Sequence, residues 1–281
     1  MTSQDSTLKA KDIGFLIRNA MRISFRAITC VASRADCTSC SIRTSCLYNS
    51  YFNRTVDGIN AKAFNLCADF TTNQDGYADK VNINLKIWGD AIRHKSFFVF
   101  AIMRMAKTGL GNGRTAFSID YIYDETEDKV LQGNYQKVKP TPTHHIPKQN
   151  ADQNKVCIQF LSPVRLNVGN EIKVNIGPRE IIEATQDRFR LLQNQYGICS
   201  PGNIPAFDLP SLDLERKSLK WVKWRRHSYI QGKKILMGGY VGYMIFYPVD
   251  EQVRTWLSIG ETIGVGVGTS FGLGRIKYKI Q

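Results

Sequence analysis

The stretch from Gly260 to Gln281 reads G-E-T-I-G-V-G-V-G-T-S-F-G-L-G-R-I-K-Y-K-I-Q and predicts a loop followed by a strand. Six glycines fall between Gly260 and Gly274, and inside a helix or strand each would cost about 0.5–1 kcal/mol relative to alanine. We therefore expect a loop that repeatedly takes positive φ and lets another backbone approach closely. From Ile276 onward apolar and basic residues alternate, with Tyr278 on the apolar face, which predicts a half-buried strand.

This stretch leaves two interpretations open. Its loop offers backbone N–H groups that can form a nest for phosphate, and three cations follow at Arg275, Lys277 and Lys279. That combination suits a surface that binds the backbone of a polyanion. The same glycines equally fit a tightly packed turn in front of a C-terminal edge strand.

The charge of the whole chain narrows the choice of partner. Its 281 residues carry 38 Lys and Arg against 24 Asp and Glu, a formal net charge of +14. Such an excess is typical of proteins that bind nucleic acid or an anionic surface. The polar start of the chain lacks the apolar segment of a signal peptide, and the apolar runs at 97–106 and 235–247 are too short to span a membrane. We therefore expect a cytoplasmic nucleic-acid-binding protein with no membrane segment.

Four of the seven cysteines cluster directly after a predicted helix at 12–28. Cys37 and Cys40 have the C-x-x-C spacing that lets two thiolates grip one tetrahedral ion, and Cys30 and Cys46 flank them. We expect a closed, structural zinc site with these four ligands and no catalytic role. A redox pair at Cys37 and Cys40, or a cluster without metal, is the alternative.

The two halves of the chain share an order of elements. In each half a helix precedes a glycine-rich turn and a closing strand, at 109–121 (G-L-G-N-G-R, then T-A-F-S-I-D-Y) and at 271–280 (F-G-L-G-R, then I-K-Y-K-I). A strand–helix–strand–strand–helix–strand unit is ferredoxin-like, and two copies fill the length. The first copy lacks a clear opening strand, because residues 1–11 show no alternation. The expected helices are 12–28, 97–107, 179–193 and 251–259, and the expected strands are 81–87, 115–123, 156–161, 238–247 and 276–280.

These elements predict an α+β protein of two tandem ferredoxin-like domains with antiparallel sheets. The N-terminal domain covers 1–125 and contains the four-cysteine zinc-binding insertion, while the C-terminal domain covers 151–281 and ends in the glycine-rich loop. Between them, residues 126–150 contain three prolines and the His144–His145 pair. We interpret them as a connector or an exposed hairpin.

Residues 218–234 (S-L-K-W-V-K-W-R-R-H-S-Y-I-Q-G-K-K) interleave cations with aromatic rings. Lysine and arginine neutralise phosphates, while Trp221, Trp224 and Tyr229 offer flat surfaces on which unpaired bases stack. The pattern favours binding of single-stranded RNA. An exposed basic hairpin whose aromatic rings lie in the core is the alternative. We call residues 218–234 the basic-aromatic segment.

Four segments follow one another in a specific order: the Arg-rich first helix with the cysteine cluster and Phe52, G-L-G-N-G-R at 109–114, F-L-S-P-V-R-L at 160–166, and 224–242 (W-R-R-H-S-Y-I-Q to G-G-Y-V-G) with the terminal glycine loop. Taken in this order, they resemble the RAMP proteins of CRISPR systems. More narrowly, they resemble the endoribonuclease that cuts the long CRISPR RNA precursor within its repeats. The chain departs from this family in its weak opening strand and in His227, where relatives often carry an aromatic residue. Several relatives keep a catalytic histidine in the first half, where this chain offers only His94.

The resemblance implies a metal-independent endoribonuclease that cleaves CRISPR repeat RNA to mature guide RNA and stays bound to its product. The 2′-hydroxyl of the RNA would attack, which leaves a 2′,3′-cyclic phosphate. The alternative is a non-catalytic RAMP subunit that binds guide RNA beside other subunits of a CRISPR effector complex. The sequence contains no dinucleotide fingerprint, P-loop, serine-hydrolase motif or tight carboxylate cluster for a two-metal nuclease that would favour another class.

For proton transfer we favour His227, because it is the only one of the four histidines inside the basic-aromatic segment. We expect Lys233 to stabilise the charge on the phosphorane and Tyr229 to orient the scissile nucleotide. The His144–His145 pair and His94 are alternatives, in which case His227 stacks on a base. The expected RNA-binding residues are Arg225, Arg226, Lys234, Gly264, Gly266, Gly268, Ser270, Gly272, Gly274 and Arg275.

Overall fold

The chain forms two compact units in the computed structural model. The first unit contains Met1–Asn60, Leu66–Ile87 and Ala91–Lys148, and the second contains Ala61–Asn65, Trp88–Asp90 and Gln149–Gln281. No helix in the described part of the chain is long and apolar enough to cross a membrane. The structure describes residues 1–3, 8, 13–32, 36–53, 62–133, 154–168, 171–172, 175–198, 206–223, 225–228 and 233–281.

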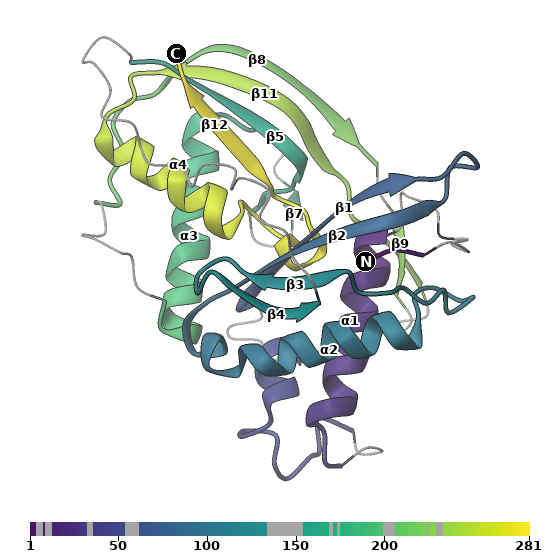
Figure 1. Ribbon diagram of the computed structural model, residues 1–281. Helices are drawn as coiled ribbons and strands as arrows, with labels where there is room; N and C mark the ends of the chain where they lie inside the picture. The colour runs from purple at the N-terminus through teal and green to yellow at the C-terminus, as the bar shows by residue number, and fades with distance from the viewer. Residues whose placement is uncertain are drawn as a thin grey trace. The chain divides into compact units, whose positions relative to one another are not determined.

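The second unit is built on a four-stranded sheet whose strands lie in the order β12-β5-β11-β8, and every neighbouring pair is antiparallel (Figure 1). Along the chain, α3 follows β5 and α4 follows β11, which gives the strand–helix–strand–strand–helix–strand order of a ferredoxin-like fold. The predicted fold class is therefore confirmed. The elements are β5 (Val156–Val164), α3 (Pro178–Tyr196), β8 (Asp213–Val222), β11 (Gly239–Tyr247), α4 (Glu251–Ile263) and β12 (Ile276–Ile280).

Two short ladders and one turn complete the second unit. β6 (Asn167–Val168) pairs with β7 (Glu171–Ile172), and β9 (Arg225–Ser228) pairs with β10 (Lys233–Leu236), both antiparallel. A 3₁₀ turn, η4 (Thr269–Phe271), lies within the glycine loop between α4 and β12.

Alternation along the strands produces the core of the second unit. Along β5 the residues Val156, Ile158 and Phe160 are buried, and they face the buried stripe of α3 and α4. Trp256 of α4 is fully buried and packs edge-to-face against Phe189 of α3 with ring centroids 5.8 Å apart. Burying such large apolar side chains is the main force that holds two helices on one face of a sheet.

The first unit contains two helices that pack on each other and two hairpins (Figure 1). β2 keeps the predicted alternation and buries Ala78 and Val81. Near its start the chain also contributes to the sheet, because Thr2 bridges Lys80 on one side and Ser118 on the other. The elements are α1 (Ile13–Thr29), η2 (Asn49–Asn53), β1 (Phe64–Thr72), β2 (Ala78–Ile87), η3 (Gly89–His94), α2 (Lys95–Thr108), β3 (Tyr121–Asp124) and β4 (Lys129–Gly133).

The first unit bears out one expectation and corrects another. As expected, no opening strand precedes α1 in the described residues, although the N–H groups of Thr2 and Ser118 each donate to the other's carbonyl oxygen at 2.9 Å. The strand expected at 115–123 is wrong over most of its length: only Tyr121–Asp124 forms a strand, while Thr115 pairs back onto Leu110 across the preceding turn. The apolar alternation there reflects burial of side chains, such as that of Phe117, rather than a continuous ladder.

Aromatic rings form the core of the first unit. Phe25 of α1 is fully buried, and its ring lies 4.9 Å from that of Phe98 on α2 and 5.2 Å from that of Phe52 on η2. Tyr48 stacks on Phe52 at 5.7 Å. These contacts tie the segment after the cysteine cluster to both helices.

The segment expected to connect the halves begins with regular structure. β3 and β4 form an antiparallel hairpin, so part of 126–150 is an exposed hairpin, one of the two forms expected for it. Lys95 of α2 forms ion pairs with Asp124 and Glu127 at this hairpin. The pair His144–His145 lies outside the described residues.

Candidate nucleic-acid interface and cysteine pocket

The glycine loop of the second unit takes positive φ at five positions, as its composition predicted. At two of them another backbone lies so close that only glycine fits: a Cβ on Gly266 would lie 2.2 Å from the carbonyl oxygen of Arg165, and one on Gly274 would lie 2.2 Å from that of Val265. Both distances are well below van der Waals contact. The five positions are Gly264, Gly266, Gly268, Gly272 and Gly274.

Several backbone N–H groups of the loop donate hydrogen bonds within the second unit. The N–H of Gly264 donates to Gly260, that of Val265 to Gly274, and that of Gly274 to the carbonyl oxygen of Pro163, each at 2.9–3.0 Å. Ser270 is buried, with 6% of its surface exposed. This geometry supports the packed-turn interpretation, because these N–H groups are already bonded within the unit. The loop still lies beside β12, which is an edge strand of the sheet.

A buried clamp that the sequence did not reveal fixes the start of the glycine loop. The carbonyl oxygen of Ile263, at the end of α4, accepts hydrogen bonds from Arg188 Nε at 2.9 Å and from Asn65 Nδ2 at 2.8 Å. Burial lowers the pKa of Arg188 to about 10. A charge removed from water in this way needs such partners, and the carbonyl at a helix C-terminus carries partial negative charge. The clamp therefore holds the loop rather than contacting a ligand.

Cations gather on the face of the sheet that is turned away from its helices. Tyr278 of β12 faces α4, where its hydroxyl hydrogen-bonds Ser258 at 2.8 Å, so Lys277 and Lys279 lie on the opposite face and are exposed. The register places Lys277 beside Gln159 of β5. In the next row Lys279 lies beside Cys157 of β5, followed by Ile245 of β11 and Arg216 of β8. This face offers positive charge to a polyanion.

The basic-aromatic segment forms a strand and a hairpin. Its first part belongs to β8, where Trp221 is half-buried and packs edge-to-face on Tyr240 with ring centroids 4.9 Å apart. Its second part is the β9–β10 hairpin, whose register sets Lys234 opposite His227 and Lys233 opposite Ser228.

The hairpin brings most of the predicted catalytic and basic positions together in the backbone. Trp224 and Tyr229 lie outside the described residues. The roles assigned to the hairpin residues remain predictions.

In the first unit, one histidine has a defined partner. His94, at the end of η3, hydrogen-bonds the hydroxyl of Tyr51 through Nδ1 at 2.8 Å. Tyr51 is buried and His94 is half-buried beside the aromatic core. A histidine held by a tyrosine hydroxyl has a fixed ring orientation, which suits either a structural role or proton transfer. No local pattern in the sequence marks this pair, because the two residues are 43 positions apart.

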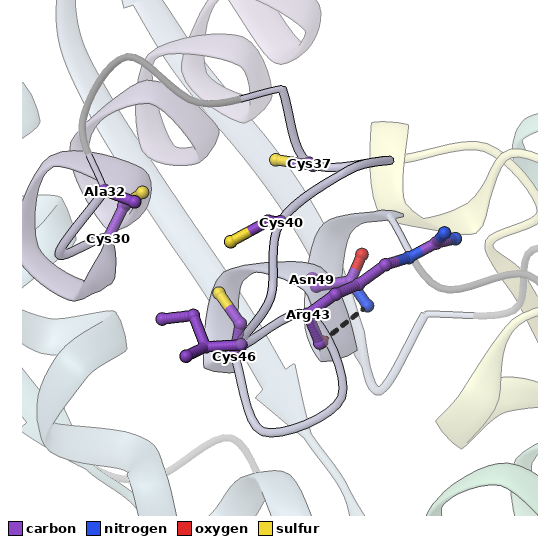
Figure 2. Close-up of a pocket in the computed structure, with 8 residues that line it drawn as sticks. Cys30, Ala32, Cys37, Cys40, Arg43, Cys46 and Asn49 are labelled. Atoms are coloured by element: carbon purple, nitrogen blue, oxygen red, sulfur yellow. Dashed lines mark hydrogen bonds between the residues drawn. The ribbon is translucent and has the colours of Figure 1, made fainter.

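The four clustered cysteines line a single pocket in the first unit. Cys30 follows the end of α1, Cys37 and Cys40 lie in successive turns, and Cys46 precedes η2. Figure 2 shows the sulfur atoms of Cys37, Cys40 and Cys46 directed towards the side of the pocket where Cys30 lies, while the guanidinium group of Arg43 points away. The predicted ligand set therefore converges on one space.

The thiols line this pocket without forming a compact cluster. Within the described part of the chain, no three His, Cys, Asp or Glu side chains lie close enough to hold a metal ion. One cation is nearby: a hydrogen bond with Cys30 raises the pKa of Arg26 above its ordinary value. Arg26 also lies over the ring of Tyr48, 5.5 Å from its centroid.

Two family models match successive parts of the chain. Residues 11–143 match the model named AF_1859_N, described as an N-terminal domain. Residues 158–276 match the model of the CRISPR-associated endoribonuclease Cas6, and this range contains β8, the β9–β10 hairpin and the glycine loop. This part of the chain is similar to a Cas6-family domain.

Whole-chain comparisons agree with this domain. An uncharacterised protein of Archaeoglobus fulgidus is 24% identical over 261 residues, which cover 89% of this chain and 86% of that protein. The fold is similar to that of a Thermus thermophilus Cas6 solved as a product complex, with a TM-score of 0.54, 14% identity and coverage of 96% of this chain and 95% of that one. A second Cas6 product complex gives a TM-score of 0.52 at 15% identity, covering 99% and 97%. Cas6 structures have tandem ferredoxin-like folds, as predicted here.

Proposed function

We propose that this protein is an endoribonuclease that cleaves CRISPR repeat RNA without a catalytic metal and keeps hold of its product. The observation that supports the proposal most is the Cas6 match over 158–276, because it covers the hairpin and the glycine loop that the sequence had selected for RNA. The net charge of +14 fits a polyanionic substrate. The protein would act in the cytoplasm, alone or beside other subunits of a CRISPR effector complex.

The proposed reaction needs three catalytic groups from the protein. A base removes the proton of the attacking 2′-hydroxyl, an acid protonates the 5′-oxygen that leaves, and a cation stabilises the pentacoordinate phosphorane. The products are a 2′,3′-cyclic phosphate and a 5′-hydroxyl. We assign one proton transfer to His227 and the orientation of the nucleotide to Tyr229.

The hairpin register bears on the choice of cation. The backbone of Lys234 lies directly opposite His227, whereas Lys233 lies opposite Ser228. Both lysines are therefore candidates for the cation that stabilises the phosphorane. The single variants Lys233→Ala and Lys234→Ala distinguish between them. The variant that lowers the cleavage rate without weakening binding identifies the catalytic cation, since a residue that only holds phosphate affects affinity.

Cleavage of a labelled CRISPR repeat RNA by the pure protein in the presence of EDTA tests the proposal. We expect one cut within the repeat and a 2′,3′-cyclic phosphate on the upstream product, because a reaction that uses the RNA's own hydroxyl needs no metal-bound water. An unrelated RNA of equal length serves as the control. Tight binding without a cut would instead identify a non-catalytic guide-RNA-binding subunit, and cleavage only with added Mg²⁺ would contradict the mechanism.

Binding should depend on the arginines of the hairpin. We expect the double variant Arg225→Ala and Arg226→Ala to weaken RNA binding and to reduce the dependence of log K on log salt by about 0.7 for each phosphate that the variant no longer neutralises. Binding measured over a series of salt concentrations checks this. The matched control is Arg179→Ala with Arg190→Ala, which removes the same charge from α3, where both arginines already pair with carboxylates. Equal affinity of the two double variants would overturn the placement of the RNA.

A further inference from the structure

The cysteine pocket of the first unit has a geometry that the proposed RNA chemistry does not use. Its wall contains four thiols, from Cys30, Cys37, Cys40 and Cys46, and apolar atoms of Ala32 and Ile42. Figure 2 shows three of the sulfur atoms directed towards the fourth cysteine. Free thiols that merely fill a core are enclosed by apolar side chains, but these four are only half-buried at the surface of the unit.

The described residues of the segment that carries these cysteines are largely exposed. Residues 41–45 are all exposed, and Val31 exposes 84% of its surface. Its turns are closed by local hydrogen bonds, such as Arg43 N–H to the carbonyl oxygen of Cys40 at 3.1 Å and Asn49 Nδ2 to that of Arg43 at 3.1 Å. Ordering a surface segment costs conformational entropy at each residue, and buried contacts are needed to offset that cost. A cross-link between the two ends of the segment would provide this stabilisation.

Both ends of the segment are anchored in the core. Cys30 directly follows α1, and Cys46 precedes the turn in which Tyr51 and Phe52 are buried. Arg26, one turn before Cys30 on α1, hydrogen-bonds that thiol and places a positive charge beside the pocket. Positive charge offsets part of the negative charge that four thiolates would bring to one ion.

We propose that these four cysteines bind one zinc ion, which closes the segment between α1 and η2. Zinc takes four thiolates at about 2.3 Å in a tetrahedral arrangement, so the sulfur atoms would approach to about 3.8 Å of each other. The turns around Cys37 and Cys40 carry the C-x-x-C spacing that provides two adjacent ligands. With all four positions taken by protein, the ion has no open site for water or RNA, and its role is structural.

The metal content of the wild-type protein, purified without chelator, tests this proposal directly. Elemental analysis should find about one zinc per chain, and the zinc should resist dialysis. Replacing zinc with cobalt(II) should give the visible absorption of a tetrahedral thiolate site. A thiol reagent should leave the four pocket cysteines unmodified until a chelator is added. None of these measurements depends on ribonuclease activity, so they test the zinc site independently of the proposed function.

Two variants localise the metal. Cys37→Ser with Cys40→Ser should reduce zinc to background, whereas Cys157→Ser, a half-buried cysteine of β5 in the second unit, should retain it. Zinc below about half an equivalent in the wild type, with all thiols reactive, would overturn the proposal. A Cys37–Cys40 disulfide in protein prepared without oxidant, seen as a loss of two hydrogen masses, would do the same. Zinc retained by the double serine variant would show that these two residues are not ligands.

Discussion

Replacing His227 with alanine should slow single-turnover cleavage of repeat RNA by roughly 10²–10⁴-fold, the usual contribution of a positioned general acid or base. The RNA affinity should remain that of the wild type, because the proposed function assigns the phosphate contacts to the arginines and lysines of the hairpin. Histidine suits the step since its ordinary pKa of about 6.5 leaves both protonation states available near neutral pH. Rates measured with enzyme in excess, beside a separate binding titration, distinguish the two effects.

The matched control is His94→Ala. His94 is held by the hydroxyl of Tyr51 at the edge of the aromatic core, and this fixed ring orientation also suits proton transfer. A rate loss in His94→Ala together with full activity in His227→Ala would transfer the catalytic role to His94. Unchanged rates in both would transfer it to the His144–His145 pair. Weakened binding in His227→Ala would instead make His227 a recognition residue.

The second unit was largely predictable because its elements have strong periodicity. The alternation of Ile276–Ile280 matches β12, and the apolar stripe through Ile182 and Phe189 matches α3. Both periods arise from burial of one face, so the sequence records them directly. Cysteine spacing likewise identified a group of side chains that the structure brings to one pocket.

Contacts between distant parts of the chain were not predictable in the same way. Asn65 reaches Arg188 at 3.4 Å across 123 positions of sequence, and no local pattern marks either residue as the other's partner. The pairing of Thr2 with Lys80 and Ser118 was not predicted for a related reason, because single bridges are too short to produce alternation in the sequence. The glycine loop was only partly predictable. Its composition predicts positive φ, but it does not predict whether RNA or the protein's own backbone lies against the glycines.

Substituting valine for Gly274 should cause a large loss of stability. Positive φ alone costs a non-glycine residue about 1–3 kcal/mol, and here φ is +73°. In addition a Cβ would lie 2.2 Å from the carbonyl oxygen of Val265, whose N–H is bonded to Gly274 in turn. The nearest atoms that the Cβ would meet all belong to the backbone of Val265, which cannot turn away as a flexible side chain could. We therefore expect the free energy of unfolding of the second unit to fall by more than the φ strain alone.

Gly197 provides a matched control for this prediction, because it has a positive φ of +62° in the same unit but no neighbouring atom within 4 Å of the added Cβ. Gly197→Ala and Gly274→Ala then both place a non-glycine residue at a positive φ, and only Gly274→Ala adds a close approach to another backbone. Tryptophan fluorescence during denaturation suits the measurement, since all four tryptophans belong to the second unit. Equal losses in the two alanine variants would mean that the loop relaxes around the added methyl group. A larger loss for Gly274→Ala, and a larger one again for the valine variant, would show that the glycines are required by the packing of the loop on β5, whatever RNA it also contacts.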